Sequence, residues 1–167
     1  GLGHFSFDPP GSHPLPTGNV IERNPVPPGS LETPEKSHLF RYTMSIYKIL
    51  ERIRTIKGVN PDKVAIMACG VSAAPALIAA ANLTGGVQAM VLERPSATWM
   101  EHWVTESSSY YAEEIRKMLE AELPRSRTKI RKSLEFLDPL VWSNAFHSPL
   151  PVSVSLEDKD EPPCGIF

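Results

Sequence analysis

The stretch from residue 62 to residue 93 constrains the fold more than any other part of this chain. Residues 64–69 form an apolar run of strand length, and the small residues 70–74 form a tight turn. An Ala-rich helical segment, residues 75–83, ends at a Gly-Gly pair. A second apolar run follows at residues 87–92. Strand, helix and strand in this order predict a βαβ unit, whose two strands are parallel.

Helical periodicity occurs on both sides of this unit. Thr33, followed by Pro34, predicts the start of an amphipathic helix that ends near Lys57. Its apolar stripe is expected to face the core; the stripe consists of Leu39, Tyr42, Ile46, Ile49, Leu50, Ile53 and Ile56. Residues 106–137 carry two further helical patterns, which are expected to meet at Pro124. A third short strand is predicted near residues 152–156.

The chain of 167 residues divides by composition into two parts. Residues 1–37 are rich in proline and show little periodicity, which predicts a long irregular segment. Residues 38–167 are expected to form an α/β domain with a helical insertion at about 106–137. In this domain the strands near 64–69, 87–92 and 152–156 are parallel and flanked by helices, as in a three-layer fold.

Charge and composition argue against several classes of function. The net charge of -2 and the absence of a long basic face argue against a nucleic-acid partner. The densest basic cluster, residues 125–132, is explained as a solvated helix face. No apolar run approaches the ~20 residues of a membrane-spanning helix, so no membrane partner is expected. The cellular compartment is not indicated, and the two cysteines form no disulfide framework.

The order of elements and three motifs resemble the α/β-hydrolase fold, and within it the acetyl xylan esterase and cephalosporin deacetylase group. Residues 59–64 resemble the approach to the nucleophile strand, and residues 69–74 occupy the position of the nucleophile elbow. Residues 136–140, together with 149–158 and the following Pro-Pro pair, resemble the stretch that carries the acidic residue of the catalytic triad. The resemblance covers residues 38–164 and implies esterase chemistry by serine acyl transfer.

The elbow can be aligned in two registers. In the first, Gly70-x-Ser72-x-Ala74 makes Ser72 the nucleophile, and the N–H of Ala73 contributes to the oxyanion hole. In the second, Gly70 occupies the nucleophile position, which leaves the elbow without a nucleophile and implies a catalytically degenerate domain that binds a ligand or a partner. Ser72 then serves as the N-cap of the following helix.

The resemblance also assigns the other site residues. Asp158 matches the acidic triad member and would orient a histidine, but no histidine follows it in this sequence. We therefore expect this chain alone to be inactive and to be a piece of a longer hydrolase, whose remainder is its expected partner. Gly70, Trp99 and Trp103 are expected to line the substrate pocket, because the loop with the two tryptophans follows the end of a strand. These tryptophans can equally cover the sheet end.

The resemblance implies a small ester or an acetylated carbohydrate as the substrate, and no cofactor. No phosphate-loop, dinucleotide-binding or zinc-binding pattern is present, so no metal is expected. Cys69 ends the first strand, where a thiol nucleophile is conceivable and a buried apolar cysteine is the simpler interpretation.

Overall fold

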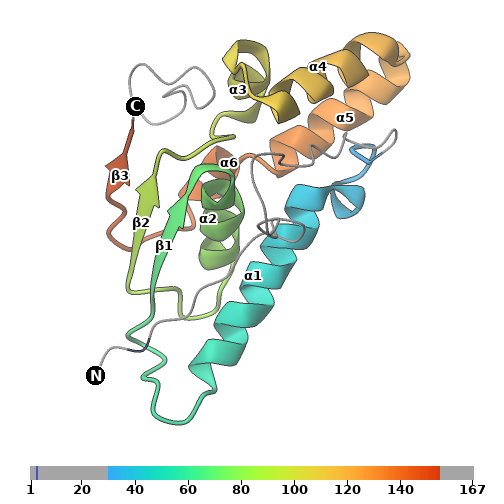
Figure 1. Cartoon of the computed structure of the whole chain (residues 1–167). Helices are drawn as coiled ribbons and strands as arrows, with labels where there is room; N and C mark the ends of the chain where they lie inside the picture. Colours follow the sequence, from blue (N-terminus) through green and yellow to red (C-terminus); the bar gives the residue numbers. More distant parts are fainter. Residues whose placement is uncertain (1–2, 4–29, 155–167) are drawn as a thin grey trace, which may run out of the picture.

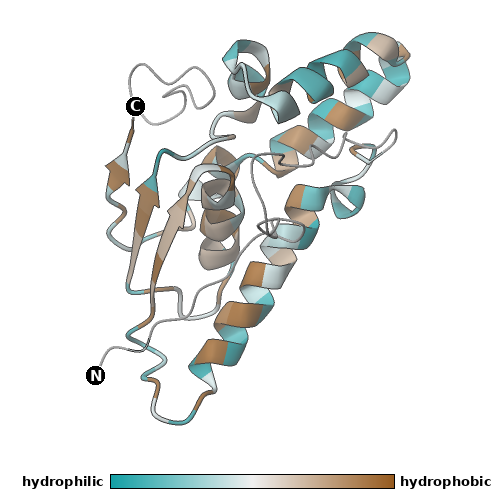
Figure 2. Cartoon of the chain, viewed as in Figure 1, coloured by the Kyte–Doolittle hydropathy of each residue, from teal (hydrophilic) through white to brown (hydrophobic). Residues whose placement is uncertain are grey.

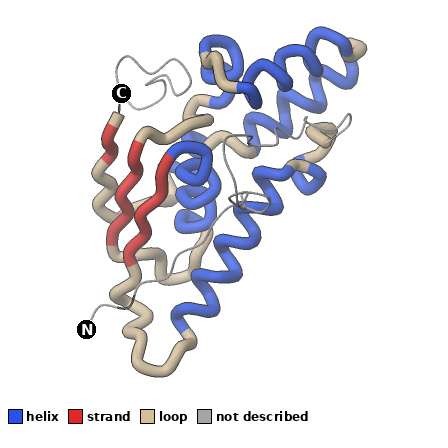
Figure 3. Tube along the Cα trace, in the orientation of Figure 1, coloured by secondary structure: helices blue, strands red, loops and turns tan. Residues whose placement is uncertain are grey.

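The computed structural model describes residue 3 and residues 30–154. Its sheet has three parallel strands in the order β1-β2-β3, with bounds β1 Ala65–Cys69, β2 Ala89–Glu93 and β3 Val152–Ser153. The strands lie side by side with the same direction (Figure 3). The predicted parallel α/β architecture is therefore confirmed. Residues 155–156 of the third predicted strand lie outside the described residues.

Two helices pack on one face of this sheet. The long helix α1 spans His38–Arg54, and α2 spans Ala73–Ala81. Every residue of α2 from Ala73 to Ala80 is buried, because the helix lies between the sheet, α1 and the short helix α6, Pro139–Ser143 (Figure 1). Figure 2 shows α2 mainly in hydrophobic to neutral colours. A helix that is apolar on all sides is stable only when it is surrounded in this way.

The start of α1 differs from the prediction. Residues Pro34–Lys36 form a separate 3-10 turn, η1, and α1 begins only after Ser37, whose hydroxyl accepts a hydrogen bond of 3.1 Å from the N–H of Leu39. Because Ser37 adopts extended backbone angles, it interrupts the helix that Thr33 and Pro34 were expected to open. Thr33 makes no side-chain capping hydrogen bond to η1.

The insertion after β2 forms a second apolar core beyond the carboxyl ends of the strands (Figure 1). It contains α3 Met100–Glu106, α4 Tyr110–Ala121 and α5 Pro124–Phe136. The sequence predicts a loop where α3 lies, and this prediction is wrong: His102 and Trp103 are helical. Pro124 occupies the first turn of α5, where its missing N–H costs no hydrogen bond.

The opposite face of the sheet carries no helix from the described residues. The side chains that alternate toward this face are exposed in β1 and intermediate to exposed in β2, and Met67 is 74% exposed. Of the three expected layers, residues 30–154 supply the sheet and one helical layer. Cys69 is an exposed free thiol rather than the buried residue we expected, because it points to this open face. None of the described helices is both long enough and apolar enough to span a bilayer.

Candidate functional site

The carboxyl end of β1 turns sharply at Gly70. Gly70 has a φ of +52°, a left-handed conformation that costs a residue with a side chain about 1–2 kcal/mol. Gly70–Ser72 form the 3-10 turn η2, which leads directly into α2. A Cβ atom built on Gly70 meets no heavy atom within 4 Å, so backbone strain rather than space favours glycine here. The corner of the strand-to-helix turn therefore lies at Gly70.

Ser72 lies in ordinary right-handed backbone, with φ -78° and ψ -19°. Its hydroxyl accepts a hydrogen bond of 2.9 Å from the phenol of Tyr42 in α1. It makes no capping hydrogen bond to α2, so the expected N-cap role is wrong. Among the described histidines, none hydrogen-bonds to Ser72. Ala73, the expected oxyanion donor, is fully buried at the start of α2.

The loop after β2 lies against this corner in a strained conformation. Arg94, Ala97 and Trp99 all have positive φ values, of 43°, 57° and 50°, although none is glycine or asparagine. The loop is fixed by a 3.2 Å hydrogen bond from the N–H of Ser96 to the carbonyl of Gly70. Backbone strain of this kind persists only where surrounding contacts enforce it, and it gathers at functional sites.

Asp138 helps to hold the loop after β2 in this strained conformation. Its Oδ2 accepts a hydrogen bond of 2.6 Å from the N–H of Met100, and its Oδ1 accepts one of 2.9 Å from the N–H of Leu140. The carboxylate thus caps α6 and ties it to the start of α3. Burial raises the pKa of Asp138, against the opposing effect of hydrogen bonds from the backbone N–H groups of Leu140, Met100 and Trp99.

The two tryptophans expected in the substrate pocket have separate environments. Trp99 is 49% exposed, and its ring stacks on His102 with 4.7 Å between the ring centroids. Trp103 is buried in the second core, where its Nε1 has no hydrogen-bond partner. Only Trp99 therefore presents a ring to solvent near the sheet end. Asp158, the expected acidic triad residue, lies outside the described residues.

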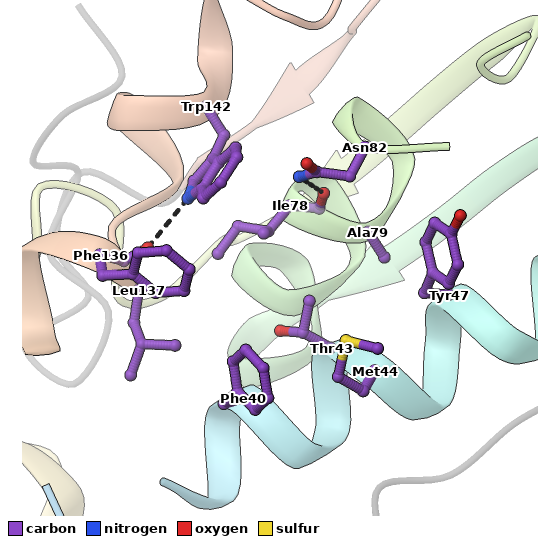
Figure 4. Close-up of a pocket in the computed structure, with 10 residues that line it drawn as sticks. All are labelled: Phe40, Thr43, Met44, Tyr47, Ile78, Ala79, Asn82, Phe136, Leu137 and Trp142. Atoms are coloured by element: carbon purple, nitrogen blue, oxygen red, sulfur yellow. Dashed lines mark hydrogen bonds between the residues drawn. The ribbon is translucent and has the colours of Figure 1, made fainter. Parts of the chain in front are cut away.

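An aromatic groove of about 320 Å³ lies along the second half of α2, between α1 and the α5–α6 connection (Figure 4). It is lined by Phe40, Thr43, Met44, Tyr47, Ile78, Ala79, Asn82, Phe136, Leu137 and Trp142. The donors of Thr43, Asn82 and Trp142 bond to the carbonyls of Leu39, Ile78 and Phe136. The groove therefore offers mainly apolar and aromatic surface. Gly70, Trp99 and Trp103 are not part of its lining.

Potential metal ligands do not gather in groups of three or more within the part of the chain that the structure describes. The described histidines are His38 at the start of α1, His102 in α3 and His147 before β3.

No protein-family model matches this chain, and no curated protein matches its sequence. Its structure is similar to the acetyl xylan esterase from Paenibacillus sp. R4, with a TM-score of 0.74 and 16% sequence identity. The match covers 82% of this chain and 44% of the esterase chain. The chain therefore has a hydrolase-like α/β fold, and it spans less than half the length of that similar protein.

Three features of this region carry no signal in the sequence. The left-handed residues at 94, 97 and 99 are arginine, alanine and tryptophan, which do not favour that conformation. The position of Asp138 before Pro139 is typical of a helix cap, but its hydrogen bond from Met100 joins residues that are 38 positions apart, so no local pattern indicates it. The groove gathers residues from four helices, α1, α2, α5 and α6, and from the connection after α5, so it exists only after folding.

Proposed function

We propose that this chain is a catalytically degenerate hydrolase-fold domain that acts by binding a ligand or a partner. The observation that carries the proposal is the left-handed φ of Gly70 at the end of β1. A nucleophile elbow holds its nucleophile at the strained residue of this turn. Glycine has no side chain to attack an acyl carbon, so the strained turn is present but its apex carries no nucleophile.

The environment of Ser72 supports the same proposal. Its hydroxyl is bonded to the phenol of Tyr42 instead of to an imidazole. A serine hydroxyl is a weak nucleophile unless a neighbouring base removes its proton. The aromatic groove along α2 provides a surface of the size at which small ligands bind, since such sites range from about 300 to 1,000 Å³.

The second candidate function is serine esterase activity in a longer protein. It is favoured by the fold shared with an acetyl xylan esterase. In this candidate Ser72 attacks the acyl carbon of a small ester or an acetylated carbohydrate, the N–H of Ala73 binds the oxyanion, and Asp158 orients a histidine supplied by other parts of the polypeptide. The proton of Ser72 passes to that histidine and then to the leaving alcohol.

A fluorophosphonate probe separates the two candidates. The intact protein that contains this chain and its Ser72→Ala variant are treated with the probe, and the labelled peptides are identified by mass spectrometry. Ser45→Ala is the matched control, because Ser45 is a partly exposed serine of α1 whose hydroxyl donates to the carbonyl of Arg41. We expect no labelling of Ser72 and no hydrolysis of p-nitrophenyl acetate beyond that of the Ser72→Ala variant. Labelling of Ser72 together with hydrolysis that is lost only in Ser72→Ala would establish the esterase candidate.

A further inference from the structure

Two rings of the aromatic groove stand at a right angle to each other. The ring centroids of Phe136 and Trp142 are 5.4 Å apart, and the ring planes meet at 89°. The ring of Phe40 lies 6.3 Å from that of Phe136 and is tilted by 41°. These three rings gather at one end of the groove, and Tyr47 lies at the other end (Figure 4). A ligand at the first end therefore meets aromatic surface from more than one direction.

The right-angled corner is held in place before any ligand binds. The indole N–H of Trp142 donates a hydrogen bond of 2.9 Å to the carbonyl of Phe136, which ties the two residues together. Between them, Leu137 is buried in the second core, and Asp138 caps α6. A binding surface that is already ordered loses less conformational freedom when a ligand binds, and this favours affinity.

The partial charges around the groove favour a cation. Two helices end there, because Asn82 is the C-cap of α2, Leu137 is the C-cap of α5, and both residues line the groove. A helix C-terminus carries a partial negative charge. Near Tyr47, the carboxylate of Glu51 lies close enough to raise the pKa of the phenol. No residue of the lining is itself charged.

The hydrogen-bond donors of the lining are largely engaged. The hydroxyl of Thr43 and the amide NH₂ of Asn82 donate to carbonyls four residues earlier in the chain, at 2.9 Å and 2.8 Å. The lining then offers ring faces, the thioether of Met44 and the side-chain oxygen of Asn82. An aromatic face carries the negative part of the ring quadrupole. These surfaces therefore suit a positive group better than an anion, which would find few donors.

We propose that the aromatic groove binds the methylated ammonium group of a small molecule such as choline. A methylated ammonium carries its charge without N–H donors, so it packs its methyl groups on ring faces and leaves no donor unsatisfied. A groove of about 320 Å³ has the size of a site for a small ligand. This inference rests on the proposed ligand-binding function and names the chemical class of the ligand.

A small molecule is favoured over a methylated lysine of another protein. A bound peptide is fixed by hydrogen bonds to its backbone. In the groove, the side chains of Thr43, Asn82 and Trp142 already bond to carbonyls of this chain. Little therefore remains to hold a peptide backbone beside the rings.

Isothermal titration of the intact protein that contains this chain tests the charge of the ligand. Choline is compared with 3,3-dimethyl-1-butanol, which has nearly the same shape but carries carbon in place of the ammonium nitrogen. We expect choline to bind about tenfold more tightly, because only the charged group gains from the ring faces. Equal affinities would overturn the cation assignment but leave the groove as a ligand site. Absence of choline binding would also overturn it, and neither result bears on the labelling of Ser72.

Two leucine variants test the place of binding. Phe136→Leu keeps an apolar side chain but removes a ring face, and it should weaken choline binding about tenfold with little effect on the neutral alcohol. Tyr111→Leu is the matched control, since Tyr111 is exposed on α4 and packs edge-on against Tyr110, outside the groove. Circular dichroism checks that both variants fold. Equal losses in the two variants would overturn the placement in the groove.

A trimethyllysine peptide tests the source of the ammonium group. It is titrated into the intact protein under the same conditions as choline. We expect the peptide to bind no more tightly than choline, because the rings contact only the methylated ammonium group. Tighter binding of the peptide, lost in Phe136→Leu, would overturn the assignment to a small molecule.

Discussion

The phenol of Tyr42 donates a 2.9 Å hydrogen bond to the hydroxyl of Ser72, across 30 residues of sequence. Tyr42 is buried in α1, and Ser72 follows the corner between β1 and α2, so this bond joins the long helix to the strand-to-helix turn. A serine held in this way is part of the packing between α1 and α2. The bond explains why Ser72 is oriented toward the helical layer although it does not cap α2.

A double-mutant cycle on Tyr42 and Ser72 should show coupling. Tyr42→Phe and Ser72→Ala each remove the bond, and each is expected to lower the free energy of unfolding by about 0.5–1.5 kcal/mol. The double variant should lose about as much as one single variant, because the bond can be lost only once. Urea denaturation measures all four proteins. A cycle of Tyr42→Phe with Ser45→Ala, whose hydroxyl bonds within α1, should show no coupling. Strictly additive losses in the first cycle would contradict the structure.

Gly70→Ala should destabilise the protein although the added methyl group meets no neighbour within 4 Å. The expected loss is about 1–2 kcal/mol, from the left-handed φ of +52° alone. Gly86→Ala is the matched comparison, because Gly86 also has a left-handed φ, of +60°, and open space around its Cβ position. Thermal and urea denaturation should give similar losses for both. A neutral Gly70→Ala variant would mean that the corner lies elsewhere.

Two equally buried alanines should respond differently to glycine. Ala97 and Ala79 are both 1% exposed, but Ala97 has a φ of 57° and Ala79 lies inside α2. Ala79→Gly should cost about 2 kcal/mol, of which about 1 reflects helix propensity and about 0.8 the lost methyl group. Ala97→Gly should be close to neutral, because relief of about 1–2 kcal/mol of strain offsets the lost methyl. Equal losses in denaturation experiments would argue against strain at Ala97.

Asp138→Asn should destabilise the junction of α3 and α6. The amide oxygen can accept a hydrogen bond from the N–H of either Leu140 or Met100. The NH₂ group of the amide then faces the other N–H, so two donors meet. An unsatisfied buried donor costs about 1–3 kcal/mol. Asp62→Asn is the control, since Asp62 is exposed in the turn before β1. Urea denaturation at neutral pH makes the comparison. Equal stability of the two variants would contradict the assigned contacts.

The pH dependence of stability gives an independent check on Asp138. Its pKa in the folded protein is raised above the usual 3.8, so the folded state binds the proton more tightly than the unfolded state. The contribution of Asp138 to the free energy of unfolding is therefore fully present below pH 3.8. It is lost as the pH rises through the raised pKa of Asp138 in the folded protein. The free energy of unfolding is measured as a function of pH for the wild type and for Asp138→Asn, and the difference between the two curves isolates this loss. A difference that rises with pH in this window would mean that the hydrogen bonds outweigh burial.

Much of the fold follows from local patterns in the sequence. The apolar runs at 64–69 and 87–92 have the length of strands and indicate β1 and β2. The Ala-rich segment between them is apolar on every side, which indicates the buried helix α2. The start of α1 and the whole of α3 were missed. Ser37 overrides a favourable Thr-Pro start. The helix α3 has apolar residues at helical spacing, Met100, Trp103 and Val104, but it is too short to repeat this spacing as longer helices do.

Local patterns are sufficient to predict a parallel strand–helix–strand unit with Gly70 and Ser72 at its turn, because strand and helix periodicities depend on neighbouring residues. The geometry of the turn itself comes from the folded chain: the left-handed corner lies at Gly70, while Ser72 bonds to Tyr42 in another helix. It also decided which face of the sheet the described helices cover, and therefore that Met67 and Cys69 are exposed. A hydrogen-bond partner or a packing face is set by residues far away in the chain, which no local pattern specifies.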